Sequence, residues 1–316
     1  MAIQVFVDGQ EGTTGLQIHE LLARRRDVDV LRIAPELRKD SVERARLLNT
    51  ADVAFLCLPD AAAREAVALV TNPKTCVIDA STAHRTDPAW IFGLPELARD
   101  QRERLRHAKR ISNPGCHSTA FILLLRPLVD AGLLDPDTRV TATSITGFSG
   151  GGRKMIERYQ AQPPVQALAS PRPYGLTLSH KHVPEMMVQS TLRARPIFMP
   201  IVANFYKGLS VSVPLHLSQM KRPIDPRQLH DALAVRYAGE RFVKVMPFAD
   251  SSLLDDGYFD VQACNDTNRC ELFVFASGEQ TILMARLDNL GKGASGAAVQ
   301  SMNVHLGLDE GLGLSA

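Results

Sequence analysis

The sequence predicts an α/β protein with a Rossmann-like, doubly wound parallel sheet, followed by a second α+β domain whose sheet is mostly antiparallel. Two observations predict this. Up to about residue 115, short apolar runs alternate with segments of helical periodicity, the pattern of parallel strands joined by crossover helices. In the last 120 or so residues, strand-like runs follow one another more closely, which favours antiparallel pairing: 198–202, 209–217, 242–245, 272–276 and 281–287.

The first strand, over residues 2–7, runs into a glycine-rich turn and then a helix that begins near Leu16. Strand, glycine-rich turn and helix form the setting in which proteins bind the pyrophosphate of a dinucleotide. The alternative is a plain turn between strand and helix. The residues that we expect at the cofactor are Gly9, Gly12, Thr13, Thr14 and Gly15.

The second strand, over residues 28–33, leads to charged residues that bear on which dinucleotide is bound. An acidic residue here would bind a ribose 2′-hydroxyl, whereas a basic residue would accommodate a 2′-phosphate. Glu36 fits the first case, and Arg38 with Lys39 fits the second. The basic pair leads us to expect NADP(H).

Further buried strands are predicted over residues 53–58, 76–80 and 109–113, with a helix over 61–70 and a turn-rich connection over 92–97. The segment Asp79–Arg85 follows one of these strands directly. Ligands of open α/β sheets bind at the carboxyl ends of the strands. This segment is therefore expected at the ligand-binding edge.

Cys116 lies in Ser112-Asn113-Pro114-Gly115-Cys116-His117-Ser118-Thr119-Ala120, immediately before the apolar run 121–125. Ser118 or Thr119 is expected to cap a buried helix over that run, which places Cys116 at or just before its N-terminus. Backbone amides and the helix dipole there lower a thiol pKa, and the thiolate is the nucleophile. The alternative is a small buried hydrophobic residue.

Two polar segments in the second half add candidate groups. Arg153 and Lys154 follow three glycines and form either an anion site or a solvated loop. His180 and His182 flank Lys181 before a helix that Pro184 is expected to open. In an extended segment the two histidines would point to the same side, and histidine is the usual general acid/base.

Composition excludes several classes of protein. The net charge of +2 gives no reason to expect nucleic acid or a membrane surface as a partner, and no apolar stretch reaches the length of a membrane span. The N-terminus enters a strand at once, so no signal peptide is expected. The five cysteines lack metal-ligand spacing, so we expect no metal and a reducing cytoplasm.

Together these residues resemble the N-acetyl-γ-glutamyl-phosphate reductases, NADP-dependent enzymes of arginine biosynthesis in the wider group of aspartate-semialdehyde dehydrogenase. The chain is similar to the shorter of the family's two types. The motifs that carry the resemblance run in order along nearly the whole chain: Gly9-x-x-Gly12-x-x-Gly15, Asp79-x-Ser81-x-x-x-Arg85, Gly93-Leu94-Pro95-Glu96, Asn113-Pro114-Gly115-Cys116, Ser149-Gly150 with Arg153-Lys154, His180-x-His182-x-Pro184-Glu185, and Asn289-Leu290-x-Lys292-Gly293-Ala294.

The resemblance implies reduction of an acyl phosphate through a Cys116 thioester, with His182 favoured over His180 as acid/base. It implies an NADP-binding domain over residues 1–115 and about 290–316, and a catalytic and oligomerisation domain over 116–289 in a homodimer or homotetramer. Further cofactor residues would be Ser81, Asn289, Gly291, Lys292 and Gly293. Substrate residues would be Arg85, Asn113, Ser149, Gly150, Arg153, Lys154 and Glu185.

Several alternatives stay open. Many relatives carry tyrosine where His117 stands, so His117 is a third candidate base. The same chemistry on an aspartyl or aminoadipyl phosphate is the nearest rival, because acyl length is read by the shape of the site. More distant rivals are a redox sensor that uses Cys116 as the sensing thiol and a non-catalytic Rossmann scaffold.

Overall fold

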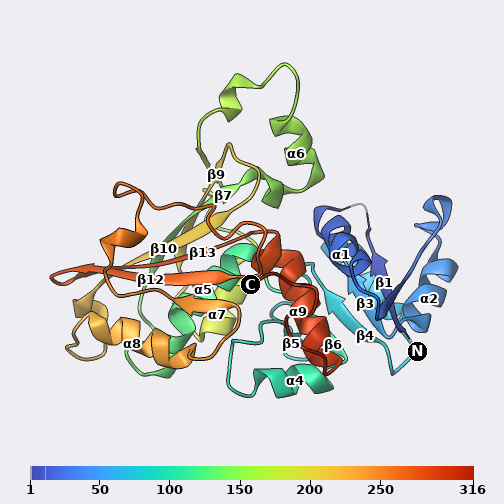
Figure 1. Ribbon diagram of the computed structural model, residues 1–316, viewed down its shortest axis with the longest axis horizontal. Coiled ribbons are helices and arrows are strands. Elements are labelled where there is room, and N and C mark those ends of the chain that lie inside the picture. Colours follow the sequence, from blue (N-terminus) through green and yellow to red (C-terminus); the bar gives the residue numbers. More distant parts are fainter. Residues whose placement is uncertain (1, 11) are drawn as a thin grey trace. The chain divides into compact units, whose positions relative to one another are not determined.

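The computed structural model describes residues 2–10 and 12–316, which form two compact units (Figure 1). One unit comprises the described residues up to Gly115 together with Ala294–Ser315. The other comprises Cys116–Gly293 and the terminal Ala316. The chain therefore leaves the first unit immediately before Cys116 and re-enters it immediately after Gly293.

The first unit is built on a six-stranded sheet in the order β2-β1-β3-β4-β6-β5. Every neighbouring pair of strands is parallel. The central strands are short apolar segments buried along their whole length, as expected for a sheet covered on both faces. The strands are β1 Ile3–Asp8, β2 Val28–Leu31, β3 Val53–Leu56, β4 Cys76–Asp79, β5 Ile91–Phe92 and β6 Arg110–Ser112.

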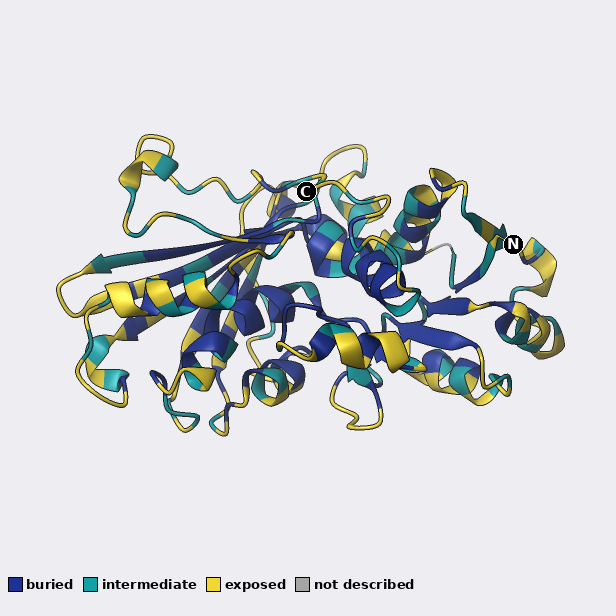
Figure 2. Cartoon of the chain, turned by 60° about the horizontal axis from the view of Figure 1, so that its bottom comes forward, coloured by how far each residue is buried: buried dark blue, intermediate teal, exposed yellow. Residues whose placement is uncertain are grey.

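Helices pack on both faces of this sheet, which makes it doubly wound. Val5 and Val7 of β1 contribute to one core with residues of α1 and α9. Phe6, between them, points the other way into a core with residues of α2 and α3. Figure 2 shows the central strands of this sheet as buried. The helices are α1 Thr13–Ala23, α2 Ser41–Thr50, α3 Asp60–Ala68, α4 Gln101–His107 and α9 Gly296–His305.

The second unit is built on a seven-stranded sheet in the order β11-β12-β13-β10-β7-β9-β8. Four of its pairings are antiparallel and two are parallel, which confirms the mostly antiparallel sheet. The strands are β7 Thr141–Gly147, β8 Arg172–Pro173, β9 Ile197–Ala203, β10 Leu209–His216, β11 Val243–Val245, β12 Cys270–Ser277 and β13 Gln280–Leu287.

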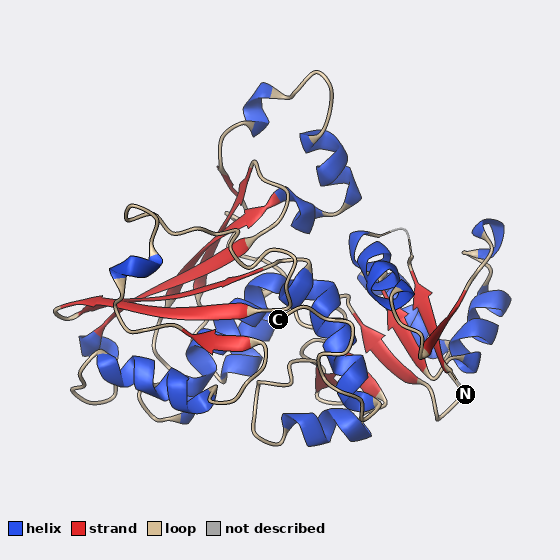
Figure 3. Cartoon of the chain, viewed as in Figure 1, coloured by secondary structure: helices blue, strands red, loops and turns tan. Residues whose placement is uncertain are grey.

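Three helices of this unit lie on one side of its sheet: α5 Cys116–Asp130, α7 Val183–Ser190 and α8 Arg227–Arg236 (Figure 3). The fourth, α6 Arg153–Tyr159, lies in a segment that projects beyond the strands (Figure 3). On the other side of the sheet, large apolar side chains are exposed to solvent, namely Ile145, Ile197, Met199 and Ile282.

Helix α5 is buried along most of its length despite an internal proline. Pro127 has no N–H, so the carbonyl of Leu123, one turn earlier, loses its usual helical donor. The hydroxyl of Tyr237 donates to that carbonyl at 2.8 Å. Tyr237, the residue after α8, thus provides the missing hydrogen-bond donor for α5, the helix that begins at Cys116.

Several boundaries differ from the prediction. Helix α5 begins at Cys116 itself, so Ser118 and Thr119 lie inside its first turn and do not cap it. Strand β5 ends at Phe92, where the predicted turn-rich connection begins, and a π-helical turn over Gly291–Ser295 precedes the terminal helix α9. Among the helices of the described residues, none is long and apolar enough to cross a lipid bilayer.

Candidate functional site

Cys116 is the first residue of the 15-residue helix α5, and its side chain is partly accessible. The unbonded amides of a first helical turn and the helix dipole stabilise a thiolate at this position. The backbone of Gly293 lies against it, because a Cβ added at Gly293 would stand 2.7 Å from the Cys116 Cβ. Any side chain at Gly293 would therefore displace Cys116.

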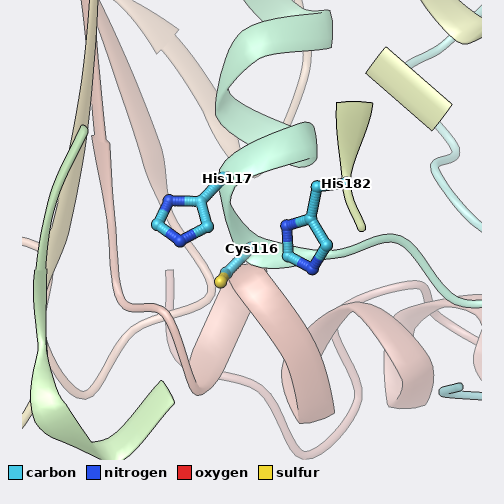
Figure 4. A group of neighbouring side chains, drawn as sticks. All are labelled: Cys116, His117 and His182. Atoms are coloured by element: carbon cyan, nitrogen blue, oxygen red, sulfur yellow. The ribbon is translucent and has the colours of Figure 1, made fainter. Parts of the chain in front are cut away.

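Histidine rings surround the thiol. The Cys116 sulfur and one nitrogen each of His117 and His182 all lie within 4.8 Å of one another. Both rings are turned toward the sulfur, one on each side (Figure 4). The ring of His180 lies 4.8 Å from that of His182 and 5.5 Å from that of His117, measured between centroids. The structure thus brings together all three candidate bases.

The segment that carries His180 and His182 is not extended. The segment is a turn, in which the amide of Val183 donates to the carbonyl of His180 at 3.0 Å and the amide of His182 donates to the ring Nδ1 of His180 at 3.2 Å. The turn itself places the two rings side by side. Lys181 is exposed to solvent.

The tautomer of His117 follows from its neighbours. The Ser144 hydroxyl donates its single proton to the carbonyl of Ser210 at 2.7 Å. At its 2.8 Å contact with Nδ1 of His117, Ser144 must therefore accept, so Nδ1 carries the proton. Nε2 is then an acceptor, and it receives the hydroxyl of Tyr174 at 3.1 Å. His117 is held as a neutral ring with a defined orientation.

Burial favours neutral rings at two of the three histidines. Desolvation, with the charges of His180 and Lys181 adding to it, lowers the pKa of His117 to about 3. Desolvation and the charge of Lys181 lower the pKa of His180 to about 4. Burial, with the charge of the Cys116 thiolate adding to it, raises the pKa of Tyr174. Near neutral pH these groups are uncharged, and the one lone pair of each imidazole accepts a hydrogen bond: Nε2 of His117 from Tyr174, and Nδ1 of His180 from the His182 amide.

Sequence reasoning missed Tyr174, Ser144 and Ser210. Tyr174 lies in the segment 160–178, whose sequence is rich in Gln, Pro and Ala and indicates no regular element. The two serines belong to strands β7 and β10. The sequence feature that could have indicated Ser144 is the alternation along β7, in which Ser144 occupies the buried side between Ala142 and Thr146. A serine at a core position implies a hydrogen-bond partner, but the sequence does not say which.

Two other predicted site residues of the second unit, Asn289 and Gly291, have clear structural roles. The Asn289 side chain donates to the Ser149 hydroxyl at 3.0 Å and accepts from the Gly208 amide at 2.8 Å. A Cβ at Gly291 would meet the Thr267 carbonyl at 2.3 Å, so glycine is required there on structural grounds alone.

Four further residues of this unit divide into buried and exposed pairs. Glu185, in the first turn of α7, and Lys292 are fully buried. Lys292 has its ammonium 5.9 Å from the Phe242 ring centroid. Gly150 and Lys154 are exposed.

The structure places Arg153 on the exposed side of α6. Its guanidinium pairs with Glu157 at 2.9 Å, one turn along the same helix, and the Arg153 side chain is 69% exposed. This is the solvated pair that the sequence left open as an alternative to an anion site.

In the first unit, the glycine-rich turn has one open position. Gly9 has φ +90°, and a Cβ there would lie 2.3 Å from the Cys57 carbonyl. A Cβ at Gly15 would lie 2.5 Å from the Gly9 carbonyl. At Gly12, the exposed N-cap of α1, the nearest atom would be 3.5 Å away. Thr13 and Thr14 begin α1, whose first turn has no acidic residue, so its N-terminus suits an anion.

The basic residues near the second strand are accessible. Arg38, partly buried, caps the short 3₁₀ helix Pro35–Leu37, and Lys39 is exposed. Arg44, which sequence reasoning missed, pairs with the buried Asp8 at 2.7 Å, directly before Gly9. This ion pair fixes the end of β1 to helix α2.

The residues after β4 are organised by the buried Asp79. Its carboxylate accepts from the Ser81 hydroxyl at 2.7 Å and lies 2.6 Å from Nδ1 of His84. Arg85 donates to the Ala80 carbonyl at 2.9 Å.

Asn113 is tied to the same region through its backbone, because its amide donates to the Asp79 carbonyl at 2.7 Å. Its side-chain amide donates to the Ala294 carbonyl at 3.0 Å. Its Oδ1 is buried without a partner among the described residues, as in a group that awaits a ligand.

Comparison with known proteins agrees with both units. Residues 34–105 match the model of the semialdehyde dehydrogenase NAD binding domain, and residues 116–289 match that of the semialdehyde dehydrogenase dimerisation domain. Among solved structures, aspartate semialdehyde dehydrogenase II from Vibrio cholerae superposes with a TM-score of 0.74 over 97% of this chain and 99% of its own, at 19% identity.

Similarity is higher to proteins named N-acetyl-gamma-glutamyl-phosphate reductase. The one from Chelativorans sp. is 47% identical over 97% of this chain and 99% of its own length, and that from Burkholderia lata is 46% identical over 96% of both. N-acetyl-gamma-glutamyl-phosphate reductase 2 of Nostoc sp. is 48% identical over 98% of this chain and 99% of its own. The chain therefore belongs to the semialdehyde dehydrogenase family, in its N-acetyl-γ-glutamyl-phosphate reductase branch.

Proposed function

We propose that this chain catalyses the NADPH-dependent reduction of N-acetyl-γ-glutamyl phosphate to N-acetylglutamate 5-semialdehyde and phosphate, a step of arginine biosynthesis. The observation that carries the proposal is the thiol of Cys116 at a helix start, with the rings of His117 and His182 turned toward it. The names of relatives that match over nearly the full chain supply the substrate.

The chemistry follows from the thiol. The Cys116 thiolate attacks the acyl carbon, the C–O bond to phosphate breaks, and phosphate leaves with the electron pair. Bound NADPH would supply the hydride that reduces this thioester, and a proton from the acid/base would complete the thiohemiacetal. Loss of the hydroxyl proton and breaking of the C–S bond release the aldehyde and regenerate the thiolate. Covalent catalysis replaces one difficult step by two easier ones.

We assign the proton transfer to His182. Its ring faces the Cys116 sulfur from the loop that enters α7 (Figure 4). His117 is less suited, because its Nδ1–H is committed to Ser144 and its Nε2 accepts from Tyr174. His180 would bind substrate beside it, with Arg85, Asn113, Ser149, Gly150, Arg153, Lys154 and Glu185 as further substrate-binding candidates.

The first unit would hold the cofactor. The open N-cap at Gly12 leaves space for a pyrophosphate against the first turn of α1, lined by Thr13 and Thr14. Arg38 with Lys39 would bind the 2′-phosphate and so favour NADP(H) over NAD(H). Ser81, Asn289, Gly291, Lys292 and Gly293 complete the proposed cofactor set. Similar kcat/KM values for NADH and NADPH would contradict the preference.

The second unit would also form a homodimer, or a tetramer built from dimers. The family model that matches this unit is that of a dimerisation domain. One face of the unit's sheet exposes Ile145, Ile197, Met199 and Ile282. Exposed apolar side chains on one face of a sheet are a feature that interfaces use. All five cysteines are free thiols, which suits the reducing cytoplasm as the site of action.

The test uses the reverse reaction, because the aldehyde is more stable than the acyl phosphate. Purified protein should reduce NADP⁺ in the presence of N-acetylglutamate 5-semialdehyde and phosphate, with no turnover when phosphate is omitted. Aspartate semialdehyde serves as the comparison substrate. Faster turnover of aspartate semialdehyde would contradict the assigned substrate, and no turnover of either would favour a redox sensor or a scaffold.

A further inference from the structure

We propose that Cys116, His117 and His182 form a binding site for a borderline-soft divalent cation such as Zn²⁺. The bound cation would inhibit the enzyme, because it occupies the nucleophilic sulfur. The inhibitory consequence rests on the proposed function of Cys116. Binding itself depends only on the arrangement of the three side chains. No spacing in the sequence indicates such a site, because His182 lies 66 positions from Cys116 (182 − 116) and the cysteines lack metal-ligand spacing.

The donor set matches zinc in type. One thiolate and two imidazoles are ligands that Zn²⁺ prefers, and three protein ligands with a water in the fourth position are typical of accessible zinc sites. Zinc bonds of about 2.0–2.3 Å place tetrahedral ligand atoms roughly 3.5 Å apart. The present separations, all within 4.8 Å, would close to this value by small side-chain rotations.

The orientation of His117 is the observation that favours a metal most specifically. Its Nδ1–H donates to Ser144, which in turn donates to the Ser210 carbonyl. Metal-bound histidines are usually oriented in this way, by a hydrogen bond from the ring nitrogen that does not bind the metal. Nε2, which accepts from the Tyr174 hydroxyl, is then the nitrogen left to bind a metal, and its ring lies beside the thiol (Figure 4).

Metal binding replaces the thiol proton of Cys116 and one hydrogen bond of His117. The Cys116 thiol releases its proton to solvent and the sulfur binds the cation. Nε2 of His117 gives up the hydrogen bond from Tyr174 and binds through its lone pair, while His182 binds through one neutral nitrogen. Water fills the fourth position. No electron is transferred, and a chelator reverses the reaction.

The first experiment measures binding without substrate. Cd²⁺ is titrated into the purified protein, and the ultraviolet charge-transfer absorption of the Cd–thiolate bond is followed. One Cd²⁺ per chain is expected, displaced by Zn²⁺. Cys116→Ser should abolish the band. His117→Gln and His182→Ala should each weaken binding at least 10-fold, and Ser144→Ala about 10-fold through loss of orientation. His107→Ala, an exposed histidine on α4, is the matched control with unchanged binding.

The second experiment does not rely on variants. Zinc K-edge absorption of the Zn²⁺-loaded wild-type protein should show one sulfur and two imidazole ligands. A ligand shell without sulfur, or His117→Gln with wild-type affinity and an intact fold, would overturn the proposal. If the protein binds Cd²⁺ as expected but turns over no acyl substrate, the site stands and the proposed function fails. Normal turnover with no Cd–thiolate band would mean that the proposed function stands and the proposed metal site fails.

Discussion

The ring of His117 and the hydroxyl of Ser144 are joined by a 2.8 Å hydrogen bond in which the ring donates. The direction is fixed because Ser144 donates to the Ser210 carbonyl at 2.7 Å. A histidine next to the proposed nucleophile is thereby held in one tautomer. Its N–H is committed to Ser144, and its lone pair on Nε2 accepts from the Tyr174 hydroxyl.

Ser144→Ala should therefore impair catalysis without removing any group that touches substrate. The ring of His117 loses its acceptor and can rotate or change tautomer, so kcat should fall about 10-fold with little change in KM. Ser144→Thr restores the hydroxyl and should recover most of the rate. The pH dependence of kcat should shift in Ser144→Ala. An unchanged pH profile, or failure of Ser144→Thr to recover the rate, would mean that Ser144 serves packing alone.

Stability should decrease as the pH falls below neutrality. The folded-state pKa of His117, about 3, lies below the 6.5 of an ordinary histidine, so the unfolded chain takes up a proton that the folded chain does not. This contribution is complete above pH 6.5 and is lost as the pH falls toward 3. His180 acts in the same direction, with a folded-state pKa of about 4.

At about pH 5, the loss from His117 alone should be about 2 kcal/mol. Urea unfolding of the wild type and of His117→Gln, near pH 7.5 and near pH 5, measures it. The decrease between the two pH values should be smaller in the variant by this amount. Equal decreases in both proteins would show that His117 is protonated in the folded state.

The glycine-rich turn contains glycines that differ in the space around them, and we expect different effects when each is changed. Gly9→Ala should lower stability by about 3 kcal/mol or more, because of its positive φ and the 2.3 Å approach to the Cys57 carbonyl. Gly12→Ala should leave stability within about 1 kcal/mol and raise the Kd for NADPH about 10-fold, since its methyl group would occupy the proposed pyrophosphate position. Thermal unfolding and NADPH fluorescence titration measure the two effects. Normal NADPH binding by Gly12→Ala would move the pyrophosphate elsewhere.

The Tyr237 hydroxyl should stabilise α5 through the carbonyl that Pro127 leaves without a helical donor. Tyr237→Phe should lower the free energy of unfolding by about 1–2 kcal/mol. Tyr258→Phe, at an exposed position, is the control with no expected effect. In a Pro127→Ala background the helix regains its own N–H donor, so the loss from Tyr237→Phe should shrink. An equal loss in both backgrounds would rule out this explanation of Tyr237.

The strands and the doubly wound sheet were predictable from the sequence because their signal is local. Runs such as 53–56 and 76–78 are continuous apolar segments, and the parallel sheet buries them on both faces. Helix α2 was not predictable in this way, because its sequence is polar with only Leu47 and Leu48 buried. Strand β5 has two residues, too few for a periodicity.

The site was predictable in its residues but not in its arrangement. Cys116, His180 and His182 stand out because reactive residue types cluster next to a helix start. The ring position of His117 depends on Ser144 and Tyr174, which are 27 and 57 positions away, and only the folded sheet brings them together. Arg153 shows the same limit, because the sequence does not reveal that its guanidinium pairs with Glu157 on the surface.

The measurement that tests the central claim most directly is a single turnover without NADPH. Enzyme mixed with excess N-acetyl-γ-glutamyl phosphate should release about one phosphate per chain in a rapid burst. Mass spectrometry should then find the acyl group on the peptide that contains Cys116. Cys116→Ser should show neither the burst nor the adduct while it still binds NADPH. A burst of wild-type size in Cys116→Ser, or an acyl group on another residue, would contradict the claim that Cys116 is the nucleophile.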